Sequence, residues 1–422
     1  MFLMKRSFIL FWRAFPVDKA RWWRIIMYCA DVIIVGAGPS GMSAAYHIMN
    51  EVGKSVNVVV LEHKDKPGKK LLATGNGRCN FTNDILDDES YRGNNPAFAY
   101  ELIYEYNKEW LIDMLYDIGI IHTSINGYYY PHSLQASAVN DSLIGAVTGG
   151  GAKVITDVHV SYVKKEKDCY VVHTDKDVYK ARYVVVAAGG KSYKALGSDG
   201  SGYDICKKLG HSIVDAHPAL CGINLKGISF KKCSGVRAKG HIWLEESGKT
   251  ISESEGELQF TDYGLSGIPV FQISRYAKCG QTLHVDFAPD YTYSELHDMF
   301  TYIWRKNNHK SIEEVLNSFL PAKLCRVLAE HDGNIKVVCN KLKDLKLNVV
   351  STLDFDKSQV TAGGVDVSEI DSKTMQSKLC DGLYIVGELL DIDGNCGGYN
   401  LHFAFASGAC AGKDIGGRIK CS

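Results

Sequence analysis

Residues 31–62, DVIIVGAGPSGMSAAYHIMNEVGKSVNVVVLE, decide the fold of this chain. Asp31–Val35 is a short, apolar, β-branched run, which predicts a strand buried on both faces. An alanine-rich stretch follows, with its apolar positions on one helical face, and Gly53 favours a helix end. A second apolar strand, Val56–Leu61, ends on Glu62. The order strand, helix, strand predicts one βαβ unit.

The first strand and the helix are joined by a G-x-G-x-x-G sequence, the dinucleotide-binding fingerprint, at residues 36–41. Gly36 makes the turn, Gly38 lets the backbone approach a pyrophosphate, and Gly41 allows tight packing of helix on strand. The helix N-terminus offers free N–H groups and a positive dipole end to the pyrophosphate. Glu62 would accept a hydrogen bond from an adenosine ribose hydroxyl.

Length and composition bound the class of protein. The 422 residues suffice for two or three domains. Lys plus Arg equals Asp plus Glu at 48 each, which argues against nucleic acid or an anionic membrane as a partner. The 13 cysteines form no C-x-x-C, so we predict no metal site, and their scatter is typical of reduced thiols in a cytoplasmic protein. No run reaches the roughly 18 apolar residues of a membrane span.

Residues 1–26 are basic and aromatic, unlike the rest of the chain. A signal peptide is one interpretation, but Arg13 interrupts the short apolar core and no A-x-A cleavage site follows. We expect a non-native or disordered extension, with Met27 at the natural start.

The polar, glycine-rich segment 63–83 is too long to be a simple connection. It predicts a cradle for phosphate and ring, formed by Lys69, Lys70, Gly75, Gly77 and Arg78. A third buried strand, Val178–Ala187, runs into Gly189, as in the third crossing of a nucleotide-binding sheet.

Other patterns predict the connecting elements. We expect a helix over 97–118, a hairpin at Asn126-Gly127, a helix over 136–147, and strands over 153–163 and 169–174. After about residue 206, alternating stretches predict a small antiparallel barrel, followed by a helical part at about 291–347.

Near the C-terminus a buried strand, Leu383–Val386, ends at Gly387-Glu388, and the glycine turn at 397–400 opens another helix. In a flavoprotein, such a positive helix end would stabilise the negative charge that builds near N1 and O2 of the reduced isoalloxazine. A distant C-terminal segment that returns to the same site favours FAD over NAD.

These patterns predict an α/β fold: a Rossmann-like FAD-binding domain of the two-dinucleotide-binding-domain flavoprotein type, interrupted by a β-barrel plus helical insertion. The FAD-binding domain would comprise residues 27–205 and 357–422, and the insertion residues 206–356.

Several long motifs resemble the YhiN-like flavoprotein family, whose members are also called BaiN-type or aminoacetone-oxidase-type enzymes. The motifs are GAGPSG, GKKLLATGNGRCNFTN, YYPHSLQAS, AAGGKSY, GSDGSGY, GELQFTDYGLSG, VTAGGVDV and GELLDIDGNCGGYNL. The resemblance covers Ala30 to Ile415 and implies an FAD-binding domain interrupted by a barrel and a helical domain. Family members include bacterial enzymes that reduce double bonds in dehydro-bile acids. The GNG at 75–77 stands where many relatives have GGG, which should alter the stiffness of this loop.

The resemblance also implies individual FAD contacts, carried over residue by residue. They are Ser40, Glu62, Lys69, Lys70, Gly75, Asn76, Gly77, Arg78, Cys79, Asn80, Val158 (through its backbone), Glu388, Asp393, Gly398 and Asn400. The fingerprint and turn residues Gly36, Gly38, Gly41, Gly189, Gly387 and Tyr399 complete the predicted cofactor site.

The catalytic residues are less defined by sequence. Reduction of a double bond needs a proton donor, and Tyr399, Tyr263 and Arg78 are candidates, each of which equally fits a packing or flavin-binding role. For Cys79 and His402 we expect buried structural roles. No second fingerprint is visible, so NAD(P)H would visit the substrate cleft transiently as reductant, or another reductant would serve.

We therefore predict an FAD-dependent oxidoreductase that moves a hydride between NAD(P)H-reduced flavin and an unsaturated small or steroid-like substrate. An amine or aminoketone oxidase on the same scaffold is one alternative. A flavin-dependent RNA-modifying protein is another, disfavoured by the balanced charge. The sequence leaves the oligomeric state open.

Overall fold

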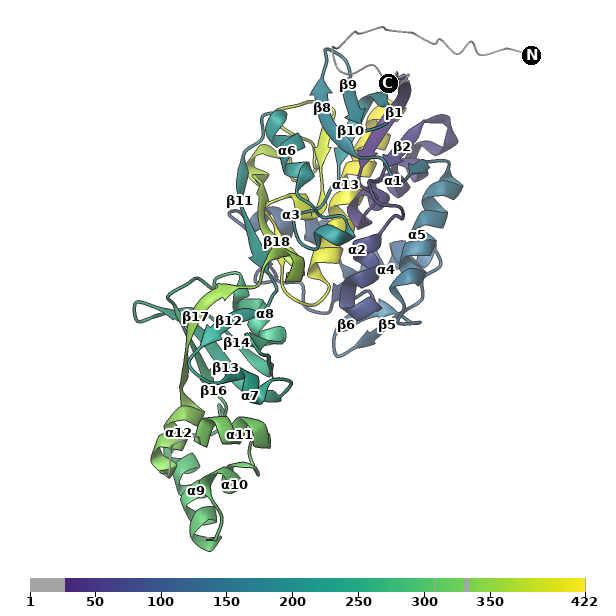
Figure 1. Cartoon of the computed structure of the whole chain (residues 1–422). Coiled ribbons are helices and arrows are strands. Elements are labelled where there is room, and N and C mark those ends of the chain that lie inside the picture. Colours follow the sequence, from purple (N-terminus) through teal and green to yellow (C-terminus); the bar gives the residue numbers. More distant parts are fainter. Residues whose placement is uncertain (1–26, 308, 330–333, 422) are drawn as a thin grey trace, which may run out of the picture.

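The computed structural model describes residues 27–307, 309–329 and 334–421, so the predicted extension at 1–26 lies outside the described residues. The described chain forms two bodies (Figure 1). One is a nucleotide-binding body, which holds the first and the last described residues. The other is a barrel with a helical cap at its far end.

A seven-stranded sheet forms the core of the nucleotide-binding body, in the order β7-β2-β1-β10-β9-β8, and β19 also pairs with β10. Five strands run parallel: β1 (Met27–Val35), β2 (Val58–Leu61), β7 (Lys153–Ile155), β10 (Val178–Val186) and β19 (Leu383–Ile385). The antiparallel strands β9 (Tyr170–Thr174) and β8 (Val160–Lys165) complete it. The β-branched residues of β1 and β10 are buried, as expected for central parallel strands.

Two helices pack side by side against this sheet: α1 (Pro39–Val52) and α13 (Tyr399–Lys420), the latter yellow in Figure 1. Glycines let their backbones approach closely. A Cβ at Gly408 would lie 2.1 Å from the carbonyl oxygen of Ser40, and one at Gly412 would lie 2.6 Å from that of Ala44. The predicted end of α1 at Gly53 is confirmed, since this residue adopts a φ of 64° directly after the helix.

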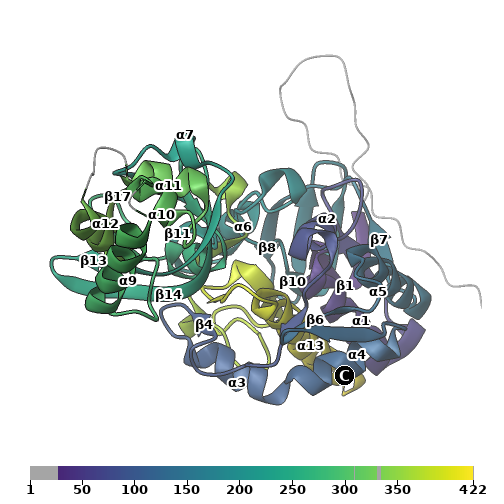
Figure 2. The ribbon, with the colours of Figure 1, turned by 90° about the horizontal axis from the view of Figure 1, so that it is seen from below.

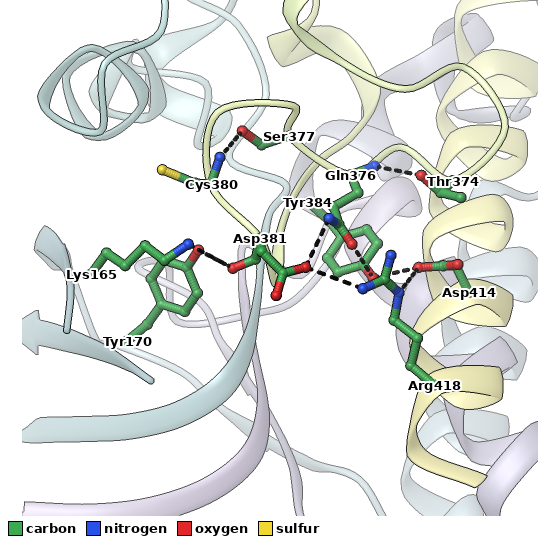
Figure 3. A network of polar contacts seen from close by, with 10 residues as sticks. All are labelled: Lys165, Tyr170, Thr374, Gln376, Ser377, Cys380, Asp381, Tyr384, Asp414 and Arg418. Carbon is green, nitrogen blue, oxygen red and sulfur yellow. Dashed lines mark hydrogen bonds and ion pairs between the residues drawn. The ribbon is translucent and has the colours of Figure 1, made fainter. Parts of the chain in front are cut away.

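A polar network fixes the far end of α13 (Figure 3). The Asp381 carbonyl accepts from the Tyr170 hydroxyl at 2.7 Å, and its Oδ1 accepts from Arg418 Nη1 at 3.2 Å. The Tyr384 hydroxyl donates to Asp414 Oδ2 at 2.5 Å, and Arg418 Nε donates to the same oxygen at 2.8 Å. The network thereby joins β9, β19 and the last turns of α13.

The hairpin at Asn126-Gly127 is confirmed by β5 (His122–Ile125) and β6 (Tyr128–Pro131), and the next helix is α5 (Ala136–Gly150). The single helix predicted over 97–118 is wrong: α3 (Ala97–Glu105) and α4 (Lys108–Asp117) replace it. Asn107 starts a new helix, because its side-chain oxygen accepts the N–H of Trp110 at 2.9 Å.

The single strand predicted over 153–163 is also wrong. Residues 153–155 and 160–165 belong to strands at opposite edges of the sheet. Residues 156–159 connect the two edges, and Asp157 has a left-handed φ of 55°.

The second body is a closed barrel in the order β12-β15-β14-β13-β16-β17. Its strands are β12 (Ile223–Lys226), β13 (Arg237–Glu246), β14 (Lys249–Phe260), β15 (Gly264–Ser266), β16 (Thr282–Asp286) and β17 (Leu345–Thr352). It shares one apolar core with the cap helices α9 (Tyr293–Lys306), α10 (Ile312–Leu316), α11 (Ala322–Ala329) and α12 (Ile335–Lys343). Figure 2 shows this body beside the nucleotide-binding body. The chain passes between the bodies through an antiparallel pair, β11 (Ile213–Ala219) and β18 (Val360–Val365).

This architecture confirms the predicted fold class, a Rossmann-like domain interrupted by a barrel and a helical part. Among the helices that the structure describes, none combines the length and apolar character that a bilayer crossing requires.

Candidate functional site

A cavity that is partly open to solvent lies where the parallel strands end. The residues after four of these strands line it: Gly36 after β1, Glu62 after β2, Gly189 after β10 and Glu388 after β19. Asn400, in the first turn of α13, lines it as well. The carboxyl ends of the strands in an open α/β sheet are where ligands bind.

The fingerprint turn has the shape that a pyrophosphate requires. Gly36 has a φ of 104°, and a Cβ at this position would lie 2.4 Å from the carbonyl oxygen of Ala187. A Cβ at Gly41 would lie 2.1 Å from the oxygen of Gly36, whereas one at Gly38 would meet nothing within 4 Å. No side chain caps the N-terminus of α1. Gly38 therefore leaves open space beside free N–H groups, and the turn fits a dinucleotide.

Glu62 is buried and held rigidly at the cavity wall. Its Oε2 accepts the N–H of Ala37 at 2.9 Å, and its Oε1 accepts that of Lys64 at 2.8 Å. A carboxylate offers about four acceptor positions, so these two bonds leave capacity for a ribose hydroxyl.

The two lysines of the predicted cradle are paired with carboxylates. Lys70 Nζ lies 2.5 Å from Glu388 Oε2, and Glu388 Oε1 accepts the N–H of Thr361 at 2.9 Å. Lys69 pairs with Asp65. The Lys70–Glu388 pair therefore offers both a donor and acceptors, which suits a hydroxyl-bearing ligand better than a lone phosphate.

The loop after α2 (Lys69–Ala73) meets the start of α13. The Thr82 hydroxyl and His402 Nδ1 share a hydrogen bond of 2.7 Å, and a Cβ at Gly398 would lie 2.6 Å from the oxygen of Thr82. Asn80 Oδ1, buried beside Gly398, has no hydrogen-bond partner among the described residues. Burial raises the pKa of the Cys79 thiol to about 12, so this cysteine is a poor nucleophile.

The turn before α13 is tied to the barrel. Asn400 fixes the turn by exchanging two 2.9 Å hydrogen bonds with the backbone of Gly394. Asp393 is almost completely buried, and this burial raises its pKa to about 7 although Arg275 opposes the shift. Arg275, which follows α8 (Ile268–Ser274) of the barrel, places Nη2 3.2 Å from Asp393 Oδ1.

The structure brings about half of the predicted cofactor residues to the cavity wall. These are Gly36, Gly38, Ser40, Glu62, Lys69, Lys70, Val158, Gly189, Glu388 and Asn400. The others lie behind the wall, in the adjacent loop or beside the start of α13: Gly41, Gly75, Asn76, Gly77, Arg78, Cys79, Asn80, Gly387, Asp393, Gly398 and Tyr399.

The three candidate proton donors have different surroundings. Tyr399 is buried, and burial raises its pKa to about 12. Arg78 is exposed. Tyr263 lies in the barrel, in the turn before β15, where it faces Gly222. His402 is fully buried and bonded through both ring nitrogens, a structural role.

Sequence reasoning missed several cavity residues, among them His63, Thr74, His159, Ser198 and Gln359. His63 and His159 adjoin the predicted contacts Glu62 and Val158, which was the available signal. Within the described ranges, no group of three His, Cys, Asp or Glu side chains is placed to hold a metal ion.

Comparison with known proteins matches residues 30–414 to the family described as "HI0933-like protein Rossmann domain". The chain is 36% identical to the 3-dehydro-bile acid delta(4,6)-reductase of Clostridium scindens, over 90% of this chain and 97% of that protein. It is 28% identical to the ribosomal RNA dihydrouridine synthase of Escherichia coli, over 91% and 98%. A solved quinol-fumarate reductase shares the fold with a TM-score of 0.50 and 14% identity, over 93% of this chain and 72% of that one.

Proposed function

Because this chain belongs to the HI0933-like Rossmann-domain family and is an FAD-dependent oxidoreductase, we propose that it reduces a carbon–carbon double bond conjugated to a carbonyl group. The substrate would be a small or steroid-like molecule of the dehydro-bile-acid type, in line with the name of the Clostridium relative. The Escherichia relative's name implies the same kind of bond, because the double bond of uridine that dihydrouridine lacks is conjugated to a carbonyl.

The observation that carries this proposal is the continuous cavity from Gly38, at the start of α1, to Asn400, at the start of α13. A dinucleotide in this cavity would have its pyrophosphate at α1 and its adenosine hydroxyls at Glu62. The Lys70–Glu388 pair would bind hydroxyls of the ribityl chain, and the positive end of α13 would face the electron-rich end of the ring. When bound, FAD supplies the hydride chemistry.

We place the substrate and the transient NAD(P)H in the cleft between the two bodies. Tyr91, Arg92 and His217 line this cleft from the nucleotide-binding body, and Arg275 and Lys278 line it from the barrel. A nicotinamide and an enone can use one cleft in turn, because each needs to contact the flavin only for its own half of the reaction.

The decisive experiment is anaerobic reduction and reoxidation of the purified yellow protein. NADH or NADPH should bleach the flavin absorbance, and a 3-oxo-4-ene bile acid should restore it with one product molecule per flavin. If neither nicotinamide reduces the flavin and no enone reoxidises it, the reductase proposal fails. Rapid reoxidation by oxygen after reduction by an aminoketone would favour the oxidase alternative.

The RNA-modifying alternative gains support from the names of two relatives, the Escherichia coli and Haemophilus influenzae ribosomal RNA dihydrouridine synthases. The zero net charge of this chain argues against it, because RNA binding needs a basic surface to neutralise phosphates. Incubation with ribosomal RNA and NADPH, followed by mass spectrometry for dihydrouridine, separates the two substrate classes.

A further inference from the structure

Two arginines, one from each body, line the cleft in which we place the substrate. Arg92 belongs to β4 (Tyr91–Arg92) of the nucleotide-binding body, and Arg275 follows α8 of the barrel. The backbone of Asp393, in β20 (Asp393–Gly394), pairs with that of Arg92, and Arg275 Nη2 lies 3.2 Å from Asp393 Oδ1. The positive charges of both arginines oppose the rise in the pKa of this carboxyl. Asp393 therefore brings the two arginines to one part of the cleft wall.

The hydrogen-bond donors of Arg275 are available to a ligand. Its side chain is 14% exposed, and its guanidinium group makes no well-aligned hydrogen bond with the described residues. None of its nitrogens is a buried atom without a partner, so these donors reach solvent, and the cleft is the cavity that Arg275 lines. Asp393 Oδ1 is shielded from solvent and Asp393 does not line the cleft, so it contacts Arg275 from behind. An arginine oriented in this way can present its remaining N–H groups to a carboxylate or a phosphate.

Arg92 adds a second cation whose charge is not compensated by its hydrogen-bond partner. Its Nη1 donates to Asn395 Oδ1, which is a neutral acceptor. Both arginines are half-buried, whereas the acidic residues that line the cleft are exposed; these are Asp88, Glu89 and Glu246. Water and salt screen exposed carboxylates more strongly than half-buried guanidinium groups. The part of the cleft beside the two arginines therefore favours an anion.

We propose that Arg92 and Arg275 form an anion subsite, which binds a carboxylate or phosphate group of the substrate while the double bond is reduced elsewhere in the cleft. This inference rests on the proposed function and narrows its substrate class to enones that carry a negative charge. A bile acid would offer its carboxylate, and a nucleotide would offer its phosphate. Arginine can donate two parallel hydrogen bonds to either group.

The test measures binding without a reaction. The yellow protein is titrated by calorimetry with a saturated 3-oxo bile acid and with its methyl ester, which lacks the charge. A second pair of ligands, uridine 5′-phosphate and uridine, tests the phosphate. Arg275→Gln and Arg92→Gln each remove one cation, whereas Arg275→Lys keeps the charge but not the planar group. Arg237→Gln is the control, because Arg237 is exposed, pairs with Glu257 and does not line the cleft.

We expect the wild type to bind the bile acid about tenfold more tightly than its ester. Each glutamine variant should weaken binding of the acid about tenfold, as for the loss of one charged hydrogen bond, and leave binding of the ester unchanged. Arg275→Lys should recover part of the loss, and Arg237→Gln should match the wild type. The same pattern for uridine 5′-phosphate over uridine, without a preference for the bile acid, would support the subsite and identify its ligand as a phosphate.

Equal binding of the charged and the uncharged member in both pairs would overturn the inference. Equal losses for both members in the glutamine variants would overturn it as well, because a purely structural role of the arginines affects both members alike. Anaerobic reoxidation of the reduced flavin by a 3-oxo-4-ene bile acid and by its ester separates this result from a failure of the proposed function. Reduction of both enones without a preference for the acid would leave the proposed function intact, whereas reduction of neither would overturn it.

Discussion

At the scale of single residues, Asp393 is the most unusual group near the site. Burial raises its pKa from 3.8 to about 7, and Arg275 compensates only in part. Arg275 Nη2 is 3.2 Å from Oδ1, but this oxygen lacks a well-aligned hydrogen bond among the described residues. The fold therefore favours the protonated carboxyl, and ionisation of Asp393 weakens the native state.

The sign of the resulting pH dependence follows from linkage. A carboxyl whose folded-state pKa is raised contributes stability that is complete below pH 3.8 and is lost as the pH rises to about 7. Asp393→Asn removes this titration. In flavin-free protein, the unfolding free energy of the wild type minus that of the variant should fall by about 1 kcal/mol per pH unit between pH 5 and 7. Urea unfolding at the two pH values measures it, and an unchanged difference would contradict the assignment.

The sequence predicted the fingerprint well because its requirements are local. Gly36 and Gly41 are needed by the turn and the adjoining helix, and both requirements can be seen in six consecutive residues. His63 and His159 carry no such local signal. They reach the cavity through a chain crossing whose course depends on which strands pair, and strand pairing is not encoded in the neighbouring residues.

At the scale of elements, the contact between α1 and α13 holds the two ends of the cavity together. At Gly408 and Gly412 the backbone of α13 lies directly against the backbone of α1, because glycine has no side chain to separate the two helices. The fingerprint helix and the C-terminal helix are thus positioned by direct backbone contact, so a displacement of one moves part of the cavity wall on the other.

Gly408→Ala should destabilise the protein by about 2 kcal/mol, because the new Cβ would overlap the carbonyl oxygen of Ser40. FAD binding should weaken as well, since Ser40 lines the cavity. The matched control is Gly417→Ala in the same helix, where a Cβ meets nothing within 4 Å. The control should be neutral or stabilising by up to about 1 kcal/mol, because alanine favours helix. Urea unfolding and FAD titration distinguish the two, and equal behaviour would show that the close approach has no energetic consequence.

The network at the other end of α13 gives a second prediction. Tyr384→Phe removes the hydroxyl that donates to Asp414, and Arg418 remains as the only other donor to this carboxylate shown in Figure 3. We expect a loss of about 1 kcal/mol, typical of one hydrogen bond. A drop in thermal midpoint without a change in the flavin spectrum would support a purely structural role. An altered spectrum would contradict it.

The error over residues 153–163 belongs to this scale. The stretch is β-favourable throughout, so its pattern predicts one strand. The structure divides it because Leu61 of β2 pairs with Ile155 on one side, whereas Val172 of β9 pairs with Val163 on the other. These partners are far apart in the sequence, and residue-by-residue patterns do not reveal them.

At the scale of the whole molecule, the barrel is attached to the turn that precedes α13. Gln272 of α8 accepts the N–H of Cys396 at 3.2 Å, and Arg275 lies against Asp393. The Ser274 hydroxyl oxygen accepts the N–H of Cys221 at 3.2 Å, close to the point where the chain enters the barrel. The inserted body thus supports the C-terminal wall of the cofactor site.

Arg275→Gln should loosen this attachment while the barrel itself stays folded. Backbone amides of residues 393–396 should exchange hydrogen about tenfold faster, because the contact between Arg275 and Asp393 is lost. Arg237→Gln is the control. It removes a solvent-exposed ion pair between Arg237 and Glu257, two residues of neighbouring barrel strands, and should leave the exchange rates of amides 393–396 unchanged. Hydrogen exchange followed by mass spectrometry resolves the segment. Faster exchange across the whole barrel would contradict a local attachment.

The cavity wall combines Gly38, from the beginning of the described chain, with Asn400, near its end. A ribosome releases Gly38 long before Asn400 has been synthesised. The nascent polypeptide therefore has no complete cofactor pocket until translation is almost finished, and a product cut short before residue 397 would remain colourless however well its first half folds.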